Sequence, residues 1–378
     1  MKKIKIIAIT IAIMFSLIYA LNLEYFIKGA RIVYLNGQTT VFIDDLKYFD
    51  YETIEATDEK SPWNERENII DTFSNEFEEL NKEFGTVAYI VIHKDTIIAE
   101  KYYKGYSSNS SSNSFSMAKT LVSAMMAKAL ELGYINSLND KVKDYIPELK
   151  GEFANDVRVI DLASMTSGLD WDEGTSDPFS PVAKQYFVSD VEELMLNQPI
   201  IEKPGERNHY SSGNTQLLSI LIERASGIKI DKFFENEIWS KINPDNDAYW
   251  QVDSKKKGNI KSFCCFHSNA RDFSRLGKLY LNYGNWNGNQ IIDSTFVKSS
   301  MKPFLDNFDG YGIGLWLKKH KDLNISLMSG HQGQYVIMIP EKELIITRLG
   351  ERDIDLGGPG VSGDVLSYID EALKLIED

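Results

Sequence analysis

A serine and a lysine three residues apart, Ser116 and Lys119, are the side chains in this sequence best suited to nucleophilic chemistry. Residues 106–114 are rich in Ser and Asn, and a nearly continuous apolar stretch follows as far as Gly133, which predicts a helix that begins near Ser116. Residues three apart on a helix have Cβ atoms about 5–6 Å from each other, so the amine can reach the hydroxyl. A serine hydroxyl becomes a good nucleophile when a neighbouring base takes its proton. The pair therefore predicts a nucleophile with its activating base.

The same spacing occurs elsewhere, and the local sequence separates the matches. Three further pairs are present: Ser226/Lys229, Ser254/Lys257 and Ser299/Lys302. The first spans a glycine that ends a helix, the second lies in a run of lysines, and the third is followed directly by a proline. Ser116 alone opens a long apolar helix. A simple helix-capping serine remains the alternative interpretation at this position.

Bulk composition fits a large globular protein with no nucleic-acid surface. The chain has 378 residues, 43% of them hydrophobic, and a formal net charge of −14. Binding to phosphates needs clustered Lys and Arg, so this charge argues against a nucleic-acid partner. Five histidines and two cysteines make a buried metal cluster improbable. Cys264 and Cys265 are adjacent, and we expect them to be small core residues that do not bridge one another.

The N-terminus has the pattern of a targeting or anchoring segment. Lys2, Lys3 and Lys5 precede residues 6–23, which contain no charged residue. As a helix these 18 residues would span about 27 Å, close to the thickness of a bilayer core. A secretory signal cleaved after Ala20 and an uncleaved membrane anchor both fit residues 1–23. Either one predicts that the remaining chain lies outside the cytoplasmic membrane.

The order of expected elements predicts an α+β fold with a split antiparallel sheet. We interpret residues 24–75 as an N-terminal extension with short strands at 30–33 and 40–43, and residues 68–83 as a helix. A β-hairpin follows at 86–92 and 96–103. Helices and loops fill an insertion at about 136–260, with helices expected at 157–165 and 215–225 and, beyond the insertion, at 271–283. Strands at 312–317, 325–328, 334–339 and 344–348 and a helix at 365–376 end the chain. The first and last parts of residues 76–378 would form one sheet, with a helical domain against it.

Three motifs in this order resemble those of the serine β-lactamases and penicillin-binding proteins. They are Ser116-Met117-Ala118-Lys119, Tyr210-Ser211-Ser212 and Gly330-His331-Gln332-Gly333-Gln334. The resemblance covers roughly residues 75–375 and is closest to the class C-like branch that contains esterases and 6-aminohexanoate-dimer hydrolases. It implies a β-lactamase/transpeptidase-like fold, in which an antiparallel sheet flanked by helices packs on a helical domain.

The resemblance also implies roles for individual residues. Ser116 would form an acyl-enzyme, with Lys119 and Tyr210 sharing the role of general base; burial and their mutual proximity could lower the pKa of one or both. The backbone N–H groups of Ser116 and Gln334 would form the oxyanion hole. Gly333, His331 and Ser212 would contact substrate, and no metal or organic cofactor is needed. Ser212 and His331 replace the asparagine and lysine of class C enzymes, which argues against β-lactam hydrolysis.

Three functions remain open on sequence grounds. The favoured one is a secreted, periplasmic or membrane-anchored serine hydrolase of a small-molecule ester or amide or of a peptide. A penicillin-recognising DD-peptidase-like enzyme is the alternative within the same fold. A non-catalytic sensor or binding protein is the alternative from another class. The intact set of Ser116, Lys119 and Tyr210 favours an enzyme.

Overall fold

The fold is given by a computed structural model that describes residues 23–175, 177–354 and 360–377, together with Lys3, Ile6, Ile9, Thr10, Ile18 and Tyr19. The predicted signal or anchor therefore falls largely outside the described residues. Among the helices that are described, none has both the length and the apolar character needed to cross a membrane.

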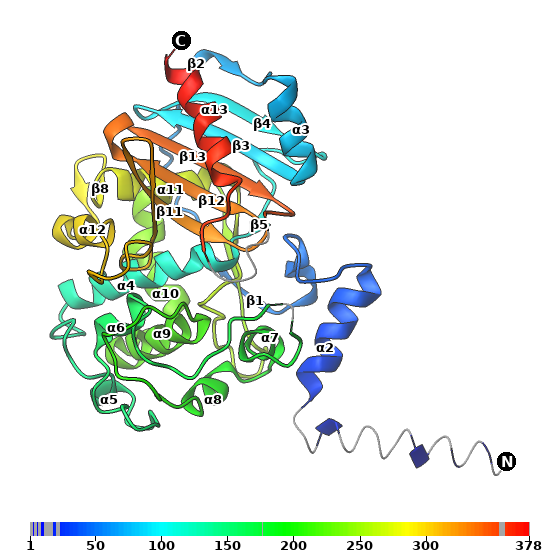
Figure 1. Cartoon of the computed structure of the whole chain (residues 1–378), viewed down its shortest axis with the longest axis vertical. Coiled ribbons are helices and arrows are strands. Elements are labelled where there is room, and N and C mark those ends of the chain that lie inside the picture. The colour runs from blue at the N-terminus through cyan, green and yellow to red at the C-terminus, as the bar shows by residue number, and fades with distance from the viewer. Residues whose placement is uncertain are drawn as a thin grey trace.

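A seven-stranded sheet forms one layer of the molecule (Figure 1). Its order is β10-β11-β12-β13-β3-β4-β2, and every neighbouring pair is antiparallel except β2 with β4. The predicted hairpin is confirmed as β3 (Thr86–His93) and β4 (Thr96–Tyr102). Three of the predicted C-terminal strands are confirmed as β11 (Leu323–Gly330), β12 (Gln334–Ile339) and β13 (Leu344–Gly350). The strand predicted at 312–317 is misplaced, because residues 312–315 are irregular and β10 spans Trp316–His320. Chain segments more than 200 residues apart thus meet where β13 pairs with β3, as a split sheet requires.

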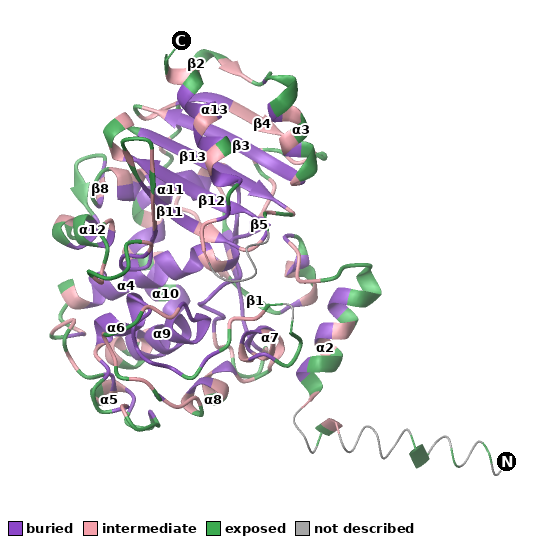
Figure 2. Ribbon diagram, viewed as in Figure 1, coloured by how far each residue is buried: buried purple, intermediate pink, exposed green. Residues whose placement is uncertain are grey.

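Helices cover both faces of this sheet. The C-terminal helix α13 (Val365–Glu377) and α3 (Asn75–Glu83) lie on one face, where Phe77, Tyr89 and Tyr368 pack together. Helix α11 (Ala270–Leu281) lies against the other face. A Cβ on Gly277 would come within 2.7 Å of Val336 and 2.9 Å of Ile345, so the glycine permits this close packing. Figure 2 shows that the central strands are buried between these layers.

The helical part of the molecule packs beneath the sheet around two nearly fully buried helices. These are α4 (Ala118–Glu131) and α9 (Ser212–Ser226), which contact one another. Both were expected from sequence, with Gly133 and Gly227 in left-handed conformations just beyond them. The shorter helices nearby are α5 (Val142–Tyr145), α6 (Val159–Ala163), α7 (Pro181–Phe187), α8 (Val191–Leu196) and α10 (Ile230–Phe234). The α+β prediction is therefore confirmed, with α12 (Ser294–Ser300) and the β8–β9 ribbon (Asn285–Trp286, Asn289–Gln290) at the periphery.

The N-terminal extension differs from the sequence prediction, because residues 30–33 are helical and residues 40–43 form no strand. Helix α2 (Glu24–Val33) buries Tyr25 and Ile32, while β1 (Tyr51–Ile54) joins a second sheet of order β1-β6-β7-β5. The other strands of that sheet are β6 (Ala248–Gln251), β7 (Phe266–Ser268) and β5 (Ser112–Asn113). The β-branched pair Ile32-Val33 suggested a strand, but packing on the rest of the molecule selects a helix instead.

The extension is joined to the interior by a buried polar network around Asp45. Its carboxylate accepts hydrogen bonds from Tyr186 Oη (2.5 Å), Gln251 Nε2 (2.8 Å) and Asn113 Nδ2 (3.1 Å). Asn113 Oδ1 in turn accepts the backbone N–H of Phe115 at 2.9 Å, one residue before Ser116. Residues before the hydrolase-like region therefore help to fix the backbone at the predicted nucleophile.

The helix predicted over residues 68–83 is only half correct. Residues 64–70 form the edge strand β2 (Asn64–Ile70), and the helix begins after Ser74, whose hydroxyl accepts the N–H of Phe77. Ile69 and Ile70 fit a helical period with Phe73 and Phe77, which is why the pattern misled. The serine cap is the local signal that sets the true boundary.

Candidate active site

Ser116 lies in a 3-10 turn, Phe115–Met117, which leads directly into α4. The turn is held tightly against β11: a Cβ on Gly330 would lie 2.2 Å from the carbonyl oxygen of Ser114. Phe115 adopts a positive φ of 44°, an unusual conformation for a side chain of its size. Ser116 is half-buried and lines a cavity, whereas its neighbours Phe115 and Met117 are buried. This geometry presents one hydroxyl on a rigid support.

Lys119 contacts that hydroxyl directly. Its Nζ donates to Ser116 Oγ at 2.9 Å and to the carbonyl oxygen of Phe263 at 3.0 Å. The lysine is only 2% exposed. Burial lowers the pKa of the Lys119 ammonium to about 8, because a charged amine is poorly solvated in the interior, and the Glu173 carboxylate acts in the opposite direction. Roughly a tenth of the amine is then neutral at pH 7, and this neutral form can accept the Ser116 proton.

The other Ser-x-x-Lys lysines lie in different surroundings. Lys229 Nζ pairs with Glu223 at 2.5 Å, and Lys257 Nζ pairs with Asp190 at 2.5 Å. Both lysines are largely exposed, and Lys302 is exposed as well. The local sequence context thus selected the pair that has the short lysine–serine contact.

Tyr210 lies beside the same pair of residues. Its ring centroid is 5.0 Å from Lys119 Nζ and 4.9 Å from the ring of Trp316. Burial raises the pKa of Tyr210, with a further contribution from the Glu173 carboxylate, while hydrogen bonds to Ser116 and Trp316 act weakly against this. Of the two expected bases, Lys119 therefore has the lowered pKa, and Tyr210 stays a protonated phenol near neutrality.

The motif at residues 330–334 divides into two parts with different roles. Gly330 and His331 line the cavity together with Ser329, at the end of β11. Gln334 is fully buried, and its side-chain amide bonds the carbonyl oxygens of His331 (3.2 Å) and Gly350 (2.5 Å), so it braces the turn. Gly333 has a φ of 79°, and a Cβ there would lie 2.0 Å from Arg348 Nη1.

The cavity beside Ser116 has a volume of about 640 Å³. Ser116, Tyr210, Glu173 and His331 line one part of it. Most of the remaining lining comes from α7, from described residues within the ranges 39–41, 174–178 and 353–362 and, unexpectedly, from α2 of the N-terminal extension. This size is ample for a small-molecule substrate. Ser116, Lys119 and Tyr210 are thus brought together at a cavity, as the motifs predicted.

Comparison with known proteins places this geometry in a family. The profile of the family described as Beta-lactamase matches residues 73–355, about three quarters of the chain. The chain belongs to the Beta-lactamase family. Among curated proteins it is similar to the 6-aminohexanoate-dimer hydrolase of Paenarthrobacter ureafaciens, with 24% identity over 299 residues that cover 72% of this chain and 74% of the relative.

Solved structures with the same fold are similar over most of this β-lactamase-family chain. A Bacillus anthracis structure assigned as a 6-aminohexanoate-dimer hydrolase superposes with a TM-score of 0.75 and 19% identity, over 89% of this chain and 92% of the other. A family VIII carboxylesterase gives a TM-score of 0.60 and 15% identity, over 82% and 100% of the two chains. The homologues and neighbours of this chain are hydrolases of the β-lactamase fold.

Glu173 is a residue of this β-lactamase-family site that the sequence reasoning missed. Its Oε2 accepts the N–H groups of Trp171 Nε1 (2.7 Å) and the Ser212 backbone (2.8 Å), and its Oε1 accepts Ser212 Oγ at 2.5 Å. Ser212, predicted to contact substrate, is buried and instead holds this carboxylate at the cavity. Glu173 follows an irregular loop, and no local pattern in the sequence indicates where that loop lies.

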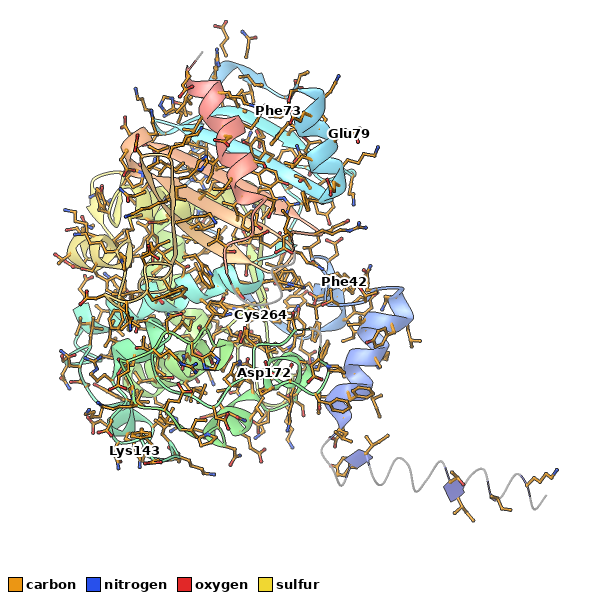
Figure 3. The ribbon with its side chains drawn as sticks, in the orientation of Figure 1. Phe42, Phe73, Glu79, Lys143, Asp172 and Cys264 are labelled. Carbon is orange, nitrogen blue, oxygen red and sulfur yellow. A yellow bond between two sulfur atoms is a disulfide. The ribbon has the colours of Figure 1, made fainter. Side chains whose placement is uncertain are left out.

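The prediction that Cys264 and Cys265 do not bridge is wrong. The structure has a disulfide between them, and both residues are buried. Cys265 takes a left-handed backbone conformation with a φ of 69°, which departs from the extended arrangement that normally separates neighbouring side chains. Cys264 is labelled in Figure 3 in the interior of the molecule. The preceding residue, Phe263, supplies the carbonyl that holds Lys119, so the disulfide adjoins the active site.

Proposed function

We propose that this protein is a serine hydrolase that cleaves an ester or amide through an acyl-enzyme on Ser116. The observation that carries the proposal is the 2.9 Å contact between Lys119 Nζ and the Oγ of Ser116, a serine that lines the cavity. Neutral Lys119 takes the Ser116 proton as Oγ attacks the carbonyl carbon. The acyl–oxygen or acyl–nitrogen bond then breaks, and water later cleaves the acyl-enzyme by the same proton route.

Tyr210 has the properties of a proton donor in this scheme. Its phenol is protonated near neutral pH and lines the cavity with Ser116, so we propose that it delivers a proton to the leaving group. We propose that Lys119, whose Nζ lies 5.0 Å from the Tyr210 ring centroid, returns a proton to the phenol afterwards. In this proposal neutral Lys119 is the general base and the Tyr210 phenol is the general acid. The sequence prediction had the two residues share the role of general base.

For the oxyanion hole we propose the backbone N–H of Ser116 and a second N–H at the end of β11. The sequence prediction assigned that second donor to Gln334. Gln334 does not appear among the described residues that line the cavity, whereas His331 does. We therefore assign the second donor to the backbone N–H of His331. Two backbone donors aimed at the developing oxyanion typically contribute several kcal/mol each to lowering the barrier.

The charges at the cavity favour an ester or amide substrate over a β-lactam. Glu173 and Asp353 both line it, and the Lys-Thr-Gly lysine of classical β-lactamases is replaced by His331. Penicillins carry a carboxylate, which two nearby acidic side chains would repel. The DD-peptidase-like alternative is disfavoured for the same reason. The basic and apolar N-terminal segment supports a location outside the cytoplasmic membrane, as a secreted or anchored enzyme.

The decisive experiment is covalent labelling of the purified protein. We expect a fluorophosphonate to label the wild type and Ser299→Ala, an exposed serine of another Ser-x-x-Lys sequence, but not Ser116→Ala. Wild type should hydrolyse p-nitrophenyl acetate, and Ser116→Ala should lose that activity. Absence of labelling and turnover in wild type would leave the non-catalytic alternative. Labelling by a fluorescent penicillin without ester turnover would favour the peptidase alternative.

A further inference from the structure

The N-terminal helix α2 contributes one wall of the cavity at Ser116. The lining residues from this helix and its end are Tyr25, Phe26, Gly29, Ala30, Val33 and Tyr34. Their spacing of one, three and four residues places them on a single helical face, and none of them is charged. The charged residues of the helix are absent from this wall: Glu24 precedes the lining residues, and Lys28 and Arg31 fall between them.

This wall is fixed to the rest of the molecule. A Cβ on Gly29 would lie 3.1 Å from the Phe187 ring, so α2 and α7 are in close contact. Phe26 stacks on Phe179, with ring centroids 5.6 Å apart and an interplanar angle of 8°. Ile32 is 1% exposed, which ties the opposite side of the helix into the core. Figure 1 shows α2 alongside α7.

The cavity lining consequently contains two chemically different groups of residues. Ser116, Tyr210, Glu173 and His331 form a polar group, where bonds would break. The uncharged α2 face together with Val182 and Phe187 of α7 forms a second, largely apolar group, which we call the apolar end of the cavity. Further polar residues of the lining include Thr39, Thr40, Thr175, Asp353 and Ser362. An apolar wall next to a reactive centre strengthens substrate binding only when apolar groups of the substrate leave water and pack against it.

We infer that the substrate is an amphiphilic ester or amide whose aliphatic chain lies along the α2 face while its carbonyl reacts at Ser116. This inference rests on the proposed hydrolase function and adds a substrate class to it. Each methylene removed from water along an apolar wall strengthens binding by up to roughly fourfold. The N-terminal extension is therefore a specificity element, and Ala30, in the middle of its cavity face, is the position at which to test it.

The test compares chain-length series on the full-length protein. Substrates are p-nitrophenyl esters from acetate to dodecanoate, with the chain on the acyl side, and acetate esters of ethanol to dodecanol, with the chain on the alcohol side. In wild type, kcat/KM should rise by roughly two- to fourfold per methylene over several carbons in at least one series. A flat or falling profile in both series overturns the inference.

Paired variants localise the effect to α2. Ala30→Glu places a carboxylate on the cavity face and should lower the long-to-short ratio of kcat/KM at least tenfold. Ile27→Glu is the matched control, because Ile27 lies on the same helix, is 40% exposed and does not line the cavity. Its ratio should stay at the wild-type value. Ala30→Phe fills the apolar end without adding charge and should move the preference towards shorter chains.

The outcomes separate this inference from the proposed function. Fluorophosphonate labelling of Ser116 checks that each variant has a folded active site. If wild type is labelled and hydrolyses acetate esters but kcat/KM does not depend on chain length, the inference of an amphiphilic substrate is wrong and the proposed hydrolase function stands. Equal ratios in Ala30→Glu and Ile27→Glu would place the chain site away from α2. Loss of labelling in wild type would instead remove the hydrolase function itself.

Discussion

The amino group of Lys119 lies 2.9 Å from the hydroxyl oxygen of Ser116, at the end of a side chain that is almost completely buried. The burial matters as much as the distance. An exposed lysine would be protonated at neutral pH and could not accept a proton, whereas burial lowers the pKa of Lys119 to about 8. The contact and the pKa together make this lysine suitable as a general base.

The pH dependence of acylation follows from that pKa. Because the reactive form has neutral Lys119, kcat/KM should rise about tenfold per pH unit below pH 8 and level off above it. Glu173→Gln should shift this limb to lower pH, since the carboxylate raises the Lys119 pKa. Measuring kcat/KM for p-nitrophenyl acetate from pH 5 to pH 10 tests both statements. A limb that stays in place in Glu173→Gln would show that another group controls it.

Replacing Lys119 by methionine should abolish acylation and stabilise the fold. The folded-state pKa lies below the usual value of 10.5, so binding a proton to Lys119 opposes folding. The resulting loss of folding stability is absent above pH 10.5 and grows as the pH falls towards 8. It reaches its full value below pH 8. A fall in the Lys119 pKa from 10.5 to about 8 corresponds to about 3 kcal/mol of lost stability, and the two hydrogen bonds lost in Lys119→Met reduce the gain from removing the amine.

Urea unfolding of wild type and Lys119→Met at pH 7, 8.5 and 10 measures this effect. The stability difference should be largest at pH 7 and should shrink as the pH rises. Lys119→Arg serves as a control for charge, because arginine keeps its proton throughout this range and should remain destabilising. A difference that is independent of pH would mean that Lys119 titrates normally in the folded protein.

Local sequence patterns were enough to single out Ser116 as the candidate nucleophile and to predict most of the elements that support it. The apolar run after Ser116 and the β-rich runs on either side of the turn at residues 93–95 are properties of neighbouring residues. The helix and the hairpin that they predict are confirmed. The fold followed because three motifs occurred in the order of a known family. These signals depend on spacing along the chain, so one sequence is sufficient to find them.

The missing parts depend on contacts between distant segments. Glu173 is placed by Ser212, almost forty residues away, and no periodicity records that contact. The α2 wall was hidden because a ten-residue helix is marginal alone and forms through packing on α7. The Cys264–Cys265 bridge depends on the left-handed backbone at Cys265, which composition does not reveal.

The disulfide between Cys264 and Cys265 predicts a simple chemical result. Denatured but unreduced protein should not react with iodoacetamide, because the chain has no other cysteine. After reduction both residues should be alkylated. Intact-protein mass spectrometry before and after reduction measures this directly. Alkylation of both cysteines without reduction would show that the bond does not form in solution.

Gly330→Ala should misplace the nucleophile while leaving most of the fold intact. The new Cβ would lie 2.2 Å from the Ser114 carbonyl oxygen, so β11 and the turn that carries Ser116 must move apart. Displacements of about 1 Å at a reacting group cost on the order of a hundredfold in rate, and local overpacking typically costs about 1–3 kcal/mol of stability.

Gly363→Ala is the matched control, because its Cβ would meet only Ile354 at an ordinary 3.5 Å. Kinetics with p-nitrophenyl acetate, alongside urea unfolding, should give a loss of kcat/KM of about a hundredfold in Gly330→Ala and little change in Gly363→Ala. Wild-type kinetics in Gly330→Ala would mean that the approach of β11 does not set the position of Ser116.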